Sequence, residues 1–255
     1  MRRFFALFLL FAASPAVAED LVLTLSTREV AITSTYTGAD ITVFGLIERD
    51  ANTIARAGGY DIVVEVRGPA GDVVVQKKDR LGPIWLTTAR KRFSKVPLFS
   101  AILSARPLAE ITDEATRGRL KLGLVHFLPE PAPDDQSPLA EREAAAFRDA
   151  LIRLRRIDQA ALILDNSVTM VRPNLFSAKI PLPATAPTGL YLVHVSVLSG
   201  GVPLKTVQAG FVVRKVGFDA FIANAARNDA ALYGLVTLLM AISLGWMANA
   251  IFRRD

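Results

Sequence analysis

Apolar and polar residues alternate along many short stretches of this chain. Clear examples run from Leu21 to Leu25, from Asp61 to Arg67 and from Tyr191 to Leu198. Because successive side chains of a strand point to opposite faces, this alternation predicts β-strands with one buried face. About seven such stretches, separated by glycine- and proline-containing turns, predict a mainly β fold.

Three local features refine this prediction. The turn residues 68–72 (GPAGD) lead us to expect Val73-Val74-Val75 as the hairpin partner of residues 61–67. Pro97 lies within the apolar stretch from Phe93 to Leu103, which predicts an irregular or edge strand. Gly189-Leu190-Tyr191 opens a late strand and resembles the tyrosine corner of immunoglobulin-like domains. Together these features favour an immunoglobulin-like β-sandwich.

Residues 106–165 interrupt the alternation and predict a helical insertion. Thr112 is expected to cap one helix, with Asp113 and Glu114 in its first turn. Ser137 is expected to cap a second helix that has Pro138 at its first position. The apolar face of this second helix recurs at steps of three and four, at Ala140, Ala144, Phe147, Leu151 and Leu154. The alternative is two domains divided near residues 129–138.

Residues 230–252 are uncharged and predominantly apolar. A helix of this length would span ~34 Å, enough to cross the ~30 Å hydrocarbon core of a bilayer. They therefore predict a single transmembrane helix near the C-terminus. Residues 217–229 precede it, and their apolar positions predict a short helix at the headgroup boundary: Phe218, Phe221, Ile222 and Ala225.

The N-terminal residues 1–18 have the parts of a cleaved signal peptide. Arg2 and Arg3 precede an apolar stretch, and Ala16-Val17-Ala18 forms a cleavage site before Glu19. Arg253 and Arg254 follow the membrane helix, where the positive-inside rule expects cytoplasmic charges. Both ends predict that residues 19–216 form an exported domain and that residues 253–255 form a cytoplasmic stub.

Composition excludes several classes of chemistry. The chain has no cysteine, so thiolate metal sites and cysteine nucleophiles are excluded. Its two histidines, His126 and His194, lack a nearby carboxylate pair, and Asp134-Asp135 and Asp165 indicate loop and turn positions. We predict no catalytic residue, no metal ligand and no cofactor.

The net charge of +6 falls to about +3 once Arg2, Arg3 and the C-terminal Arg-Arg-Asp are set aside, which does not favour nucleic acid as a partner.

One stretch is strongly basic. Its cations stand against a single acid, Asp79, and are Lys77, Lys78, Arg80, Arg90, Lys91, Arg92 and Lys95. They are either solvated hairpin ends or an anion-binding surface for lipid headgroups, an acidic partner or a small oxyanion. Trp85 within the stretch is either a contact residue or, more commonly for tryptophan, a core residue.

Small residues recur at steps of three and four in the membrane helix: Gly234, Thr237, Ala241, Gly245 and Ala248. Small residues allow close approach of transmembrane helices. This face predicts association with the helix of a membrane-protein partner or of a second copy of the chain.

Several segments resemble the alphaproteobacterial putative transmembrane protein family. They are residues 38–45 (GADITVFG), 58–69 (GGYDIVVEVRGP), 84–86, 106–111 (RPLAEI), 147–154 (FRDALIRL), 180–184 (IPLPA), 189–191, 213–218 (VRKVGF) and 251–254. The resemblance implies a bacterial inner membrane and a periplasmic domain, and it suggests association with a sulfite-exporter-type permease. The shared segments carry no active-site motif.

We therefore expect a non-enzymatic accessory subunit of a membrane transport or envelope system, in contact with membrane lipid. One alternative is a structural or envelope-stress component without a ligand. Another is an enzyme at the periplasmic face, with a polar cleft around His194 or Asp165.

Overall fold

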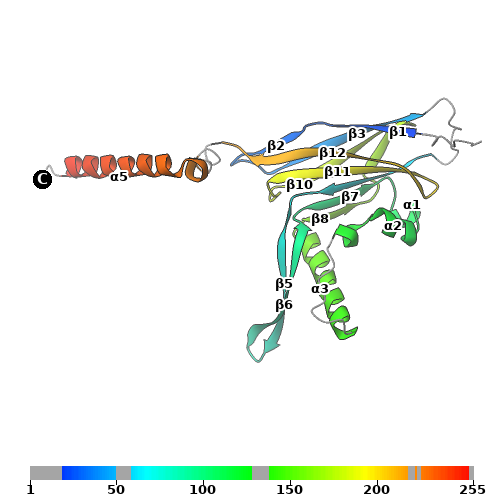
Figure 1. Cartoon of the computed structure of the whole chain (residues 1–255), viewed down its shortest axis with the longest axis horizontal. Coiled ribbons are helices and arrows are strands. Elements are labelled where there is room, and N and C mark those ends of the chain that lie inside the picture. The colour runs from blue at the N-terminus through cyan, green and yellow to red at the C-terminus, as the bar shows by residue number, and fades with distance from the viewer. Residues whose placement is uncertain (1–18, 50–58, 128–137, 218–221, 223–224, 253–255) are drawn as a thin grey trace, which may run out of the picture.

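The computed structural model describes residues 19–49, 59–127, 138–217, 222 and 225–252. The predicted signal peptide and the C-terminal stub lie outside these residues. Most of the described chain forms two β-sheets, from which a two-stranded ribbon and a long helix extend (Figure 1). The mainly β prediction is confirmed.

The first sheet has four antiparallel strands, in the order β1 (Glu19–Leu25), β3 (Gly38–Arg49), β10 (Leu175–Pro183) and β9 (Val168–Arg172). The second sheet has six strands, in the order β2 (Glu29–Ile32), β12 (Val202–Lys215), β11 (Gly189–Ser199), β4 (Asp61–Arg67), β7 (Ser100–Ser104) and β8 (Ala161–Leu164). In this sheet, β2 runs parallel to β12 and β8 runs parallel to β7.

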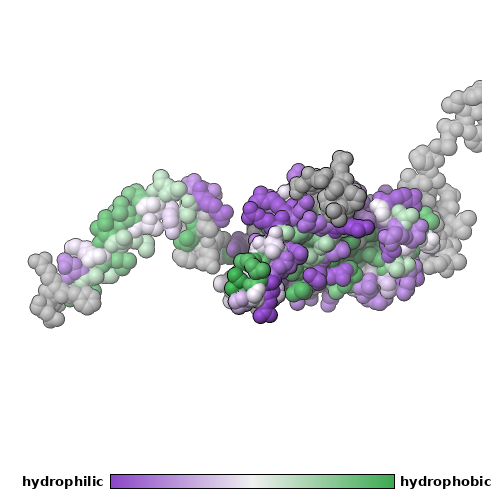
Figure 2. All heavy atoms as spheres, turned by 90° about the horizontal axis from the view of Figure 1, so that it is seen from below, coloured by the Kyte–Doolittle hydropathy of each residue, from purple (hydrophilic) through white to green (hydrophobic). Residues whose placement is uncertain are grey.

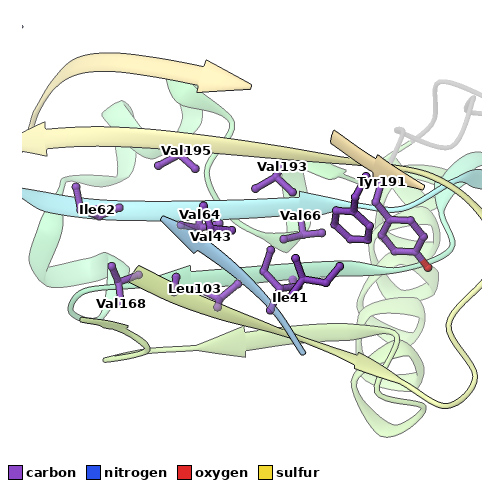
Figure 3. Close-up of a cluster of buried hydrophobic side chains, with 14 of the residues drawn as sticks. Ile41, Val43, Ile62, Val64, Val66, Leu103, Val168, Tyr191, Val193 and Val195 are labelled. Carbon is purple, nitrogen blue, oxygen red and sulfur yellow. The ribbon is translucent and has the colours of Figure 1, made fainter. Parts of the chain in front are cut away.

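The two sheets pack face to face around the main hydrophobic core. Figure 3 shows Ile41 and Val43 of β3 in the same buried layer as Val64 and Val66 of β4. The alternating residues of these strands supply this layer because each strand turns one face inward. The core explains why the period-two pattern is clear in the sequence.

Tyr191 makes the contact expected of a tyrosine corner. Its hydroxyl donates a hydrogen bond to the carbonyl of Pro187, at 2.8 Å. Its buried ring stacks on Phe211, with 4.9 Å between ring centroids. The immunoglobulin-like type of the sandwich remains a prediction.

The predicted hairpin between residues 61–67 and 73–75 is wrong. Strand β4 pairs with β11 on one side and with β7 on the other, so both of its edges are filled. Residues 70–81 form β5 (Ala70–Leu81), which pairs instead with β6 (Ile84–Pro97) and leaves the sandwich. The turn residues do redirect the chain, but toward a separate two-stranded sheet.

The predicted edge strand over residues 93–103 is also wrong in its second half. Pro97 ends β6, and β7 is an inner strand between β4 and β8, with every residue buried. Ala101 and Leu103 face the core of the sandwich, whereas Ile102 faces the opposite side of the sheet. Proline is tolerated here because it lies outside the inner strand.

The first part of the helical insertion covers the outer face of the six-stranded sheet. It comprises α1 (Leu108–Ile111), α2 (Glu114–Leu120) and the 3-10 helix η1 (Leu124–Phe127). Ile111, Leu122 and Leu124 pack there against Val63 and Ile102 of the sheet.

The cap of α2 is Asp113, whose carboxylate accepts from the Thr116 N–H at 3.0 Å. The predicted cap, Thr112, instead donates to the carbonyl of Gly201.

The second part of the insertion packs on the ribbon. Helix α3 (Pro138–Ile157) begins at Pro138, as predicted. Phe147 and Leu151 are buried against the ribbon, whereas Leu154 is exposed. Residues 161–164 of the predicted insertion form strand β8 of the sandwich.

Helix α5 (Ala230–Phe252) is long and apolar enough to cross a membrane, and none of its most apolar part is buried within the chain. In the preceding segment, Phe218 and Phe221 of the predicted headgroup-boundary helix lie outside the described residues. Ile222 and residues 225–228 are helical, and the Asp229 N–H donates to the carbonyl of Ala225.

Candidate interaction surface

The basic stretch lies on a projecting β-ribbon, made of β5 and β6. The two strands join at a two-residue turn, Gly82-Pro83, with Leu81 and Ile84 paired at the end. Gly82 has φ +62°, a conformation that glycine adopts without a steric penalty. The turn therefore closes tightly, and the ribbon extends away from the sandwich (Figure 1).

One face of the ribbon is covered by α3. Val75, Phe93 and Val96 of the ribbon are buried together with Phe147 and Leu151 of the helix. Isolated two-stranded ribbons are marginally stable in water, so this small core is what holds the ribbon in place. The Arg155 guanidinium also donates to the carbonyl of Pro97, which ties the end of α3 to the root of the ribbon.

The opposite face, which we call the free face, carries most of the cations. Directly paired residues of antiparallel strands share a face, and the pairs here are Val74 with Arg92, Gln76 with Arg90, Lys78 with Thr87 and Arg80 with Trp85. Four of the predicted cations therefore gather on one exposed surface: Lys78, Arg80, Arg90 and Arg92.

The other three predicted cations are separated from this group. Lys77 and Lys91 alternate with it, on the side that faces α3, and Lys95 lies at the root, where its N–H donates to Asp72. Lys77 pairs with Asp79 at 3.3 Å. Hydrogen bonds from Thr88 and Lys77 hold the pKa of the Asp79 carboxyl below its usual range. The one acid of the stretch is thus paired with Lys77 rather than with a cation of the free face.

The end of the ribbon, which we call the tip, exposes large apolar side chains. Leu81 is 68% exposed, Trp85 66%, Ile84 53% and Leu86 42%. The core interpretation of Trp85 is therefore wrong. In Figure 2, where the ribbon points toward the viewer, hydrophobic and hydrophilic spheres gather side by side at its end.

A groove of about 290 Å³ lies between β5 and α3. Its lining combines apolar side chains with polar and basic ones, including Lys78 of the free face: Val75, Ala146, Phe147 and Ala150, with Gln76, Lys77, Lys78 and Arg153. A groove of this kind suits an amphipathic segment with negative charge.

A second polar cluster lies on the outer face of the six-stranded sheet. Glu65 is buried there, its Oε2 accepts from Arg67 Nη2 at 3.3 Å, and His194 is its cross-strand partner. Burial raises the pKa of the Glu65 carboxyl to about 7, against the opposing effect of Arg67. Burial, and then Arg67, lower the pKa of His194. This buried carboxyl could not be recognised from the sequence, because its burial depends on the helices that cover the sheet.

The other candidate polar residues are not brought together. Asp165 accepts from the Ser104 hydroxyl at 3.1 Å, which makes it part of a turn, and His126 is exposed. Within the described residues, no group of three or more histidine and acidic side chains is placed to hold a metal ion.

The small residues of α5 are open to contact. A side chain added at Gly234 or Gly245 would meet no atom within 4 Å. Thr237 donates its hydroxyl back to carbonyls of its own helix, at 3.0 Å, so its polar group is satisfied within the bilayer. Association through this face remains a prediction.

A family model described as "Putative transmembrane protein (Alph_Pro_TM)" matches residues 20–254. The chain belongs to this alphaproteobacterial family. The match includes the sandwich, the ribbon and α5, and together with the apolar character of α5 it places this family member in a membrane. No functionally curated protein shows significant similarity to the chain.

Proposed function

We propose that this family member is a non-enzymatic accessory subunit of a bacterial inner-membrane transport or envelope system. In this proposal, residues 19–216 lie in the periplasm, α5 crosses the inner membrane and residues 253–255 are cytoplasmic. The family match and α5 support the membrane location. The Arg253-Arg254 pair supports the orientation.

The β-ribbon is the observation that carries this proposal. Its α3 side is packed, while its free face exposes four cations and its tip exposes four large apolar side chains. Exposed apolar side chains and exposed charges contribute little to folding and are typical of surfaces that bind another molecule. We assign the ribbon as the interaction element of the subunit.

The small-residue face of α5 is the candidate contact with a second membrane helix. The family resemblance suggests a sulfite-exporter-type permease as the partner, and a second copy of the chain is the other candidate. In either assembly, α5 would associate within the bilayer while the ribbon makes contacts outside it.

Copurification of the full chain from a native host in mild detergent tests the proposal. The expected result is a complex that is weakened by Arg90→Glu with Arg92→Glu. The matched control is Arg172→Glu with Lys179→Glu, which reverses two exposed cations of the sandwich. Recovery of the wild type as a free monomer, or equal loss in both variants, would contradict the proposal.

A structural envelope component without a ligand is the alternative function. A deletion strain separates the two, because a general loss of envelope integrity favours the structural role. A defect confined to transport of one solute favours the accessory role.

A further inference from the structure

We propose that the tip of the β-ribbon inserts into the headgroup region of the anionic bilayer that holds α5. This inference rests on the proposed function in one respect, since it takes the ribbon as the interaction element. It goes further by naming the partner of the tip as a lipid surface.

The side chains of the tip suit a membrane interface. Trp85 and Leu81 are about two-thirds exposed, and Ile84 and Leu86 are exposed beside them at the same end of the ribbon. Tryptophan has a large apolar ring and one polar N–H group, which places it at the boundary between hydrocarbon and headgroups. Leucine and isoleucine gain from leaving water for the acyl region. A two-residue turn presents all four at one end of a narrow element.

The position of the cations matches the depth of such an insertion. Lys78 precedes Leu81 by three residues, so at ~3.4 Å per residue it lies ~10 Å behind the tip. Apolar groups at interfaces penetrate ~5–10 Å, which would leave Lys78 at the level of the phosphates. Arg80 lies only ~3 Å behind Leu81, so its long side chain would have to extend back to the same level. Arg90 and Arg92 lie farther along the same face. Cations at this level are attracted by an anionic leaflet.

The ribbon and the membrane tether leave the sandwich at the same end. Leu192 of β11 pairs with Arg67 on one side and with Gly210 on the other, so these two residues are level in the sheet. From Arg67 the chain continues three residues to Ala70, where the ribbon starts. From Gly210 it continues in the same direction to Lys215, where β12 ends. The end of the sandwich that is tethered to the bilayer is therefore also the end that carries the ribbon.

The lengths of the two connections are compatible. The segment between β12 and α5, residues 216–229, includes the helical residues 225–228, so it can span at most ~40 Å. A strand of the length of β5 (12 residues) extends ~40 Å at ~3.4 Å per residue. The tip can thus reach the bilayer surface while the sandwich remains outside it.

Tryptophan fluorescence of the full chain tests the inference. The chain has two tryptophans, and Trp246→Phe removes the one in α5, leaving Trp85 as the only reporter. The protein is reconstituted in vesicles of neutral lipid, or of neutral lipid mixed with phosphatidylglycerol, with and without brominated acyl chains. In the anionic vesicles we expect Trp85 to emit at shorter wavelength, to be quenched by the bromines and to be protected from iodide.

Charge variants test the role of the cations. In the same background, Lys78→Gln with Arg80→Gln should lower the ratio of inserted to free tip by about 25-fold, at about fivefold for each cation near an anionic surface. Arg172→Gln with Lys179→Gln, on the sandwich, should leave the ratio unchanged. Both pairs are exposed, so circular dichroism should show the wild-type fold.

Three results would overturn the inference. The first is a Trp85 that stays open to iodide and untouched by brominated lipid in anionic vesicles. The second is equal insertion of wild type and the Lys78/Arg80 variant. The third is protection of Trp85 only when a protein partner is added. Under the first or third result, the copurification experiment separates the two proposals. If the complex is still weakened by the Arg90 and Arg92 substitutions, the lipid contact is wrong but the proposed function is not contradicted.

Discussion

Replacing Glu65 by glutamine should stabilise the protein above neutral pH. The Glu65 side chain is 5% exposed and lies between Arg67 and His194 on a face covered by the helical insertion. An ionised carboxylate in this position has lost most of its hydration and recovers only part of it from Arg67. A neutral amide of the same shape avoids that loss.

The magnitude follows from the pKa of Glu65, which burial raises from 4.5 to about 7. Between these values the folded state keeps a proton that the unfolded state releases, so the contribution of Glu65 to stability is greatest below pH 4.5 and is lost as pH rises toward 7. The full difference corresponds to roughly 3 kcal/mol at pH 8. For a chain of this size, such a change moves Tm by about 6–12 °C.

The assay is thermal unfolding of the full chain in detergent, followed by circular dichroism at pH 5 and at pH 8. Glu65→Gln should exceed the wild type by less than about 1 kcal/mol at pH 5 and by roughly 3 kcal/mol at pH 8. The lowered pKa of His194 acts in the opposite direction below pH 6.5, but it is present in both proteins and largely cancels in the comparison. Equal differences between the two proteins at both pH values, or a more stable wild type at pH 8, would contradict an energetic cost of ionising Glu65.

Three further substitutions have expected outcomes. Gly45→Ala should cost about 1–3 kcal/mol in denaturant unfolding, since its new methyl group would overlap the buried Phe176 ring; an unchanged midpoint would contradict this. Tyr191→Phe removes the hydrogen bond to the Pro187 carbonyl and should cost about 1 kcal/mol in the same assay, whereas no loss would show that the bond is energetically neutral. Gly245→Leu should weaken association of α5 without preventing insertion, and a complex of unaltered size on native gels would count against the small-residue face.

Elements that depend on local sequence alone could be predicted well. The uncharged stretch of α5 is sufficient for a membrane helix because a bilayer requires only length and apolar composition. Helix α3 starts at Pro138 because proline fits the first turn of a helix. Tyr191, Val193 and Val195 share the inner face of β11, as their alternation indicated.

Strand partners could not be predicted in the same way. Val73 to Val75 are β-branched, as suits any strand of the sandwich, and their backbone groups are chemically the same as those of β7. The decisive fact is that β4 already has β11 and β7 on its two edges. The distribution of the cations has the same origin, since the pairing of β5 with β6 places Arg90 and Arg92 on the free face and Lys91 toward α3.

The amino-acid sequence alone indicates that a β-rich body is joined to one apolar helix, that a helical segment interrupts the body and that a basic stretch lies in its first half. Long-range contacts are needed to form a separate ribbon from this stretch, to expose Trp85 at its tip and to bury Glu65. Periodicity records which side chains of a strand share a face. It does not record which strand or helix will cover that face, because backbone hydrogen-bonding groups and apolar surfaces are common to every candidate partner.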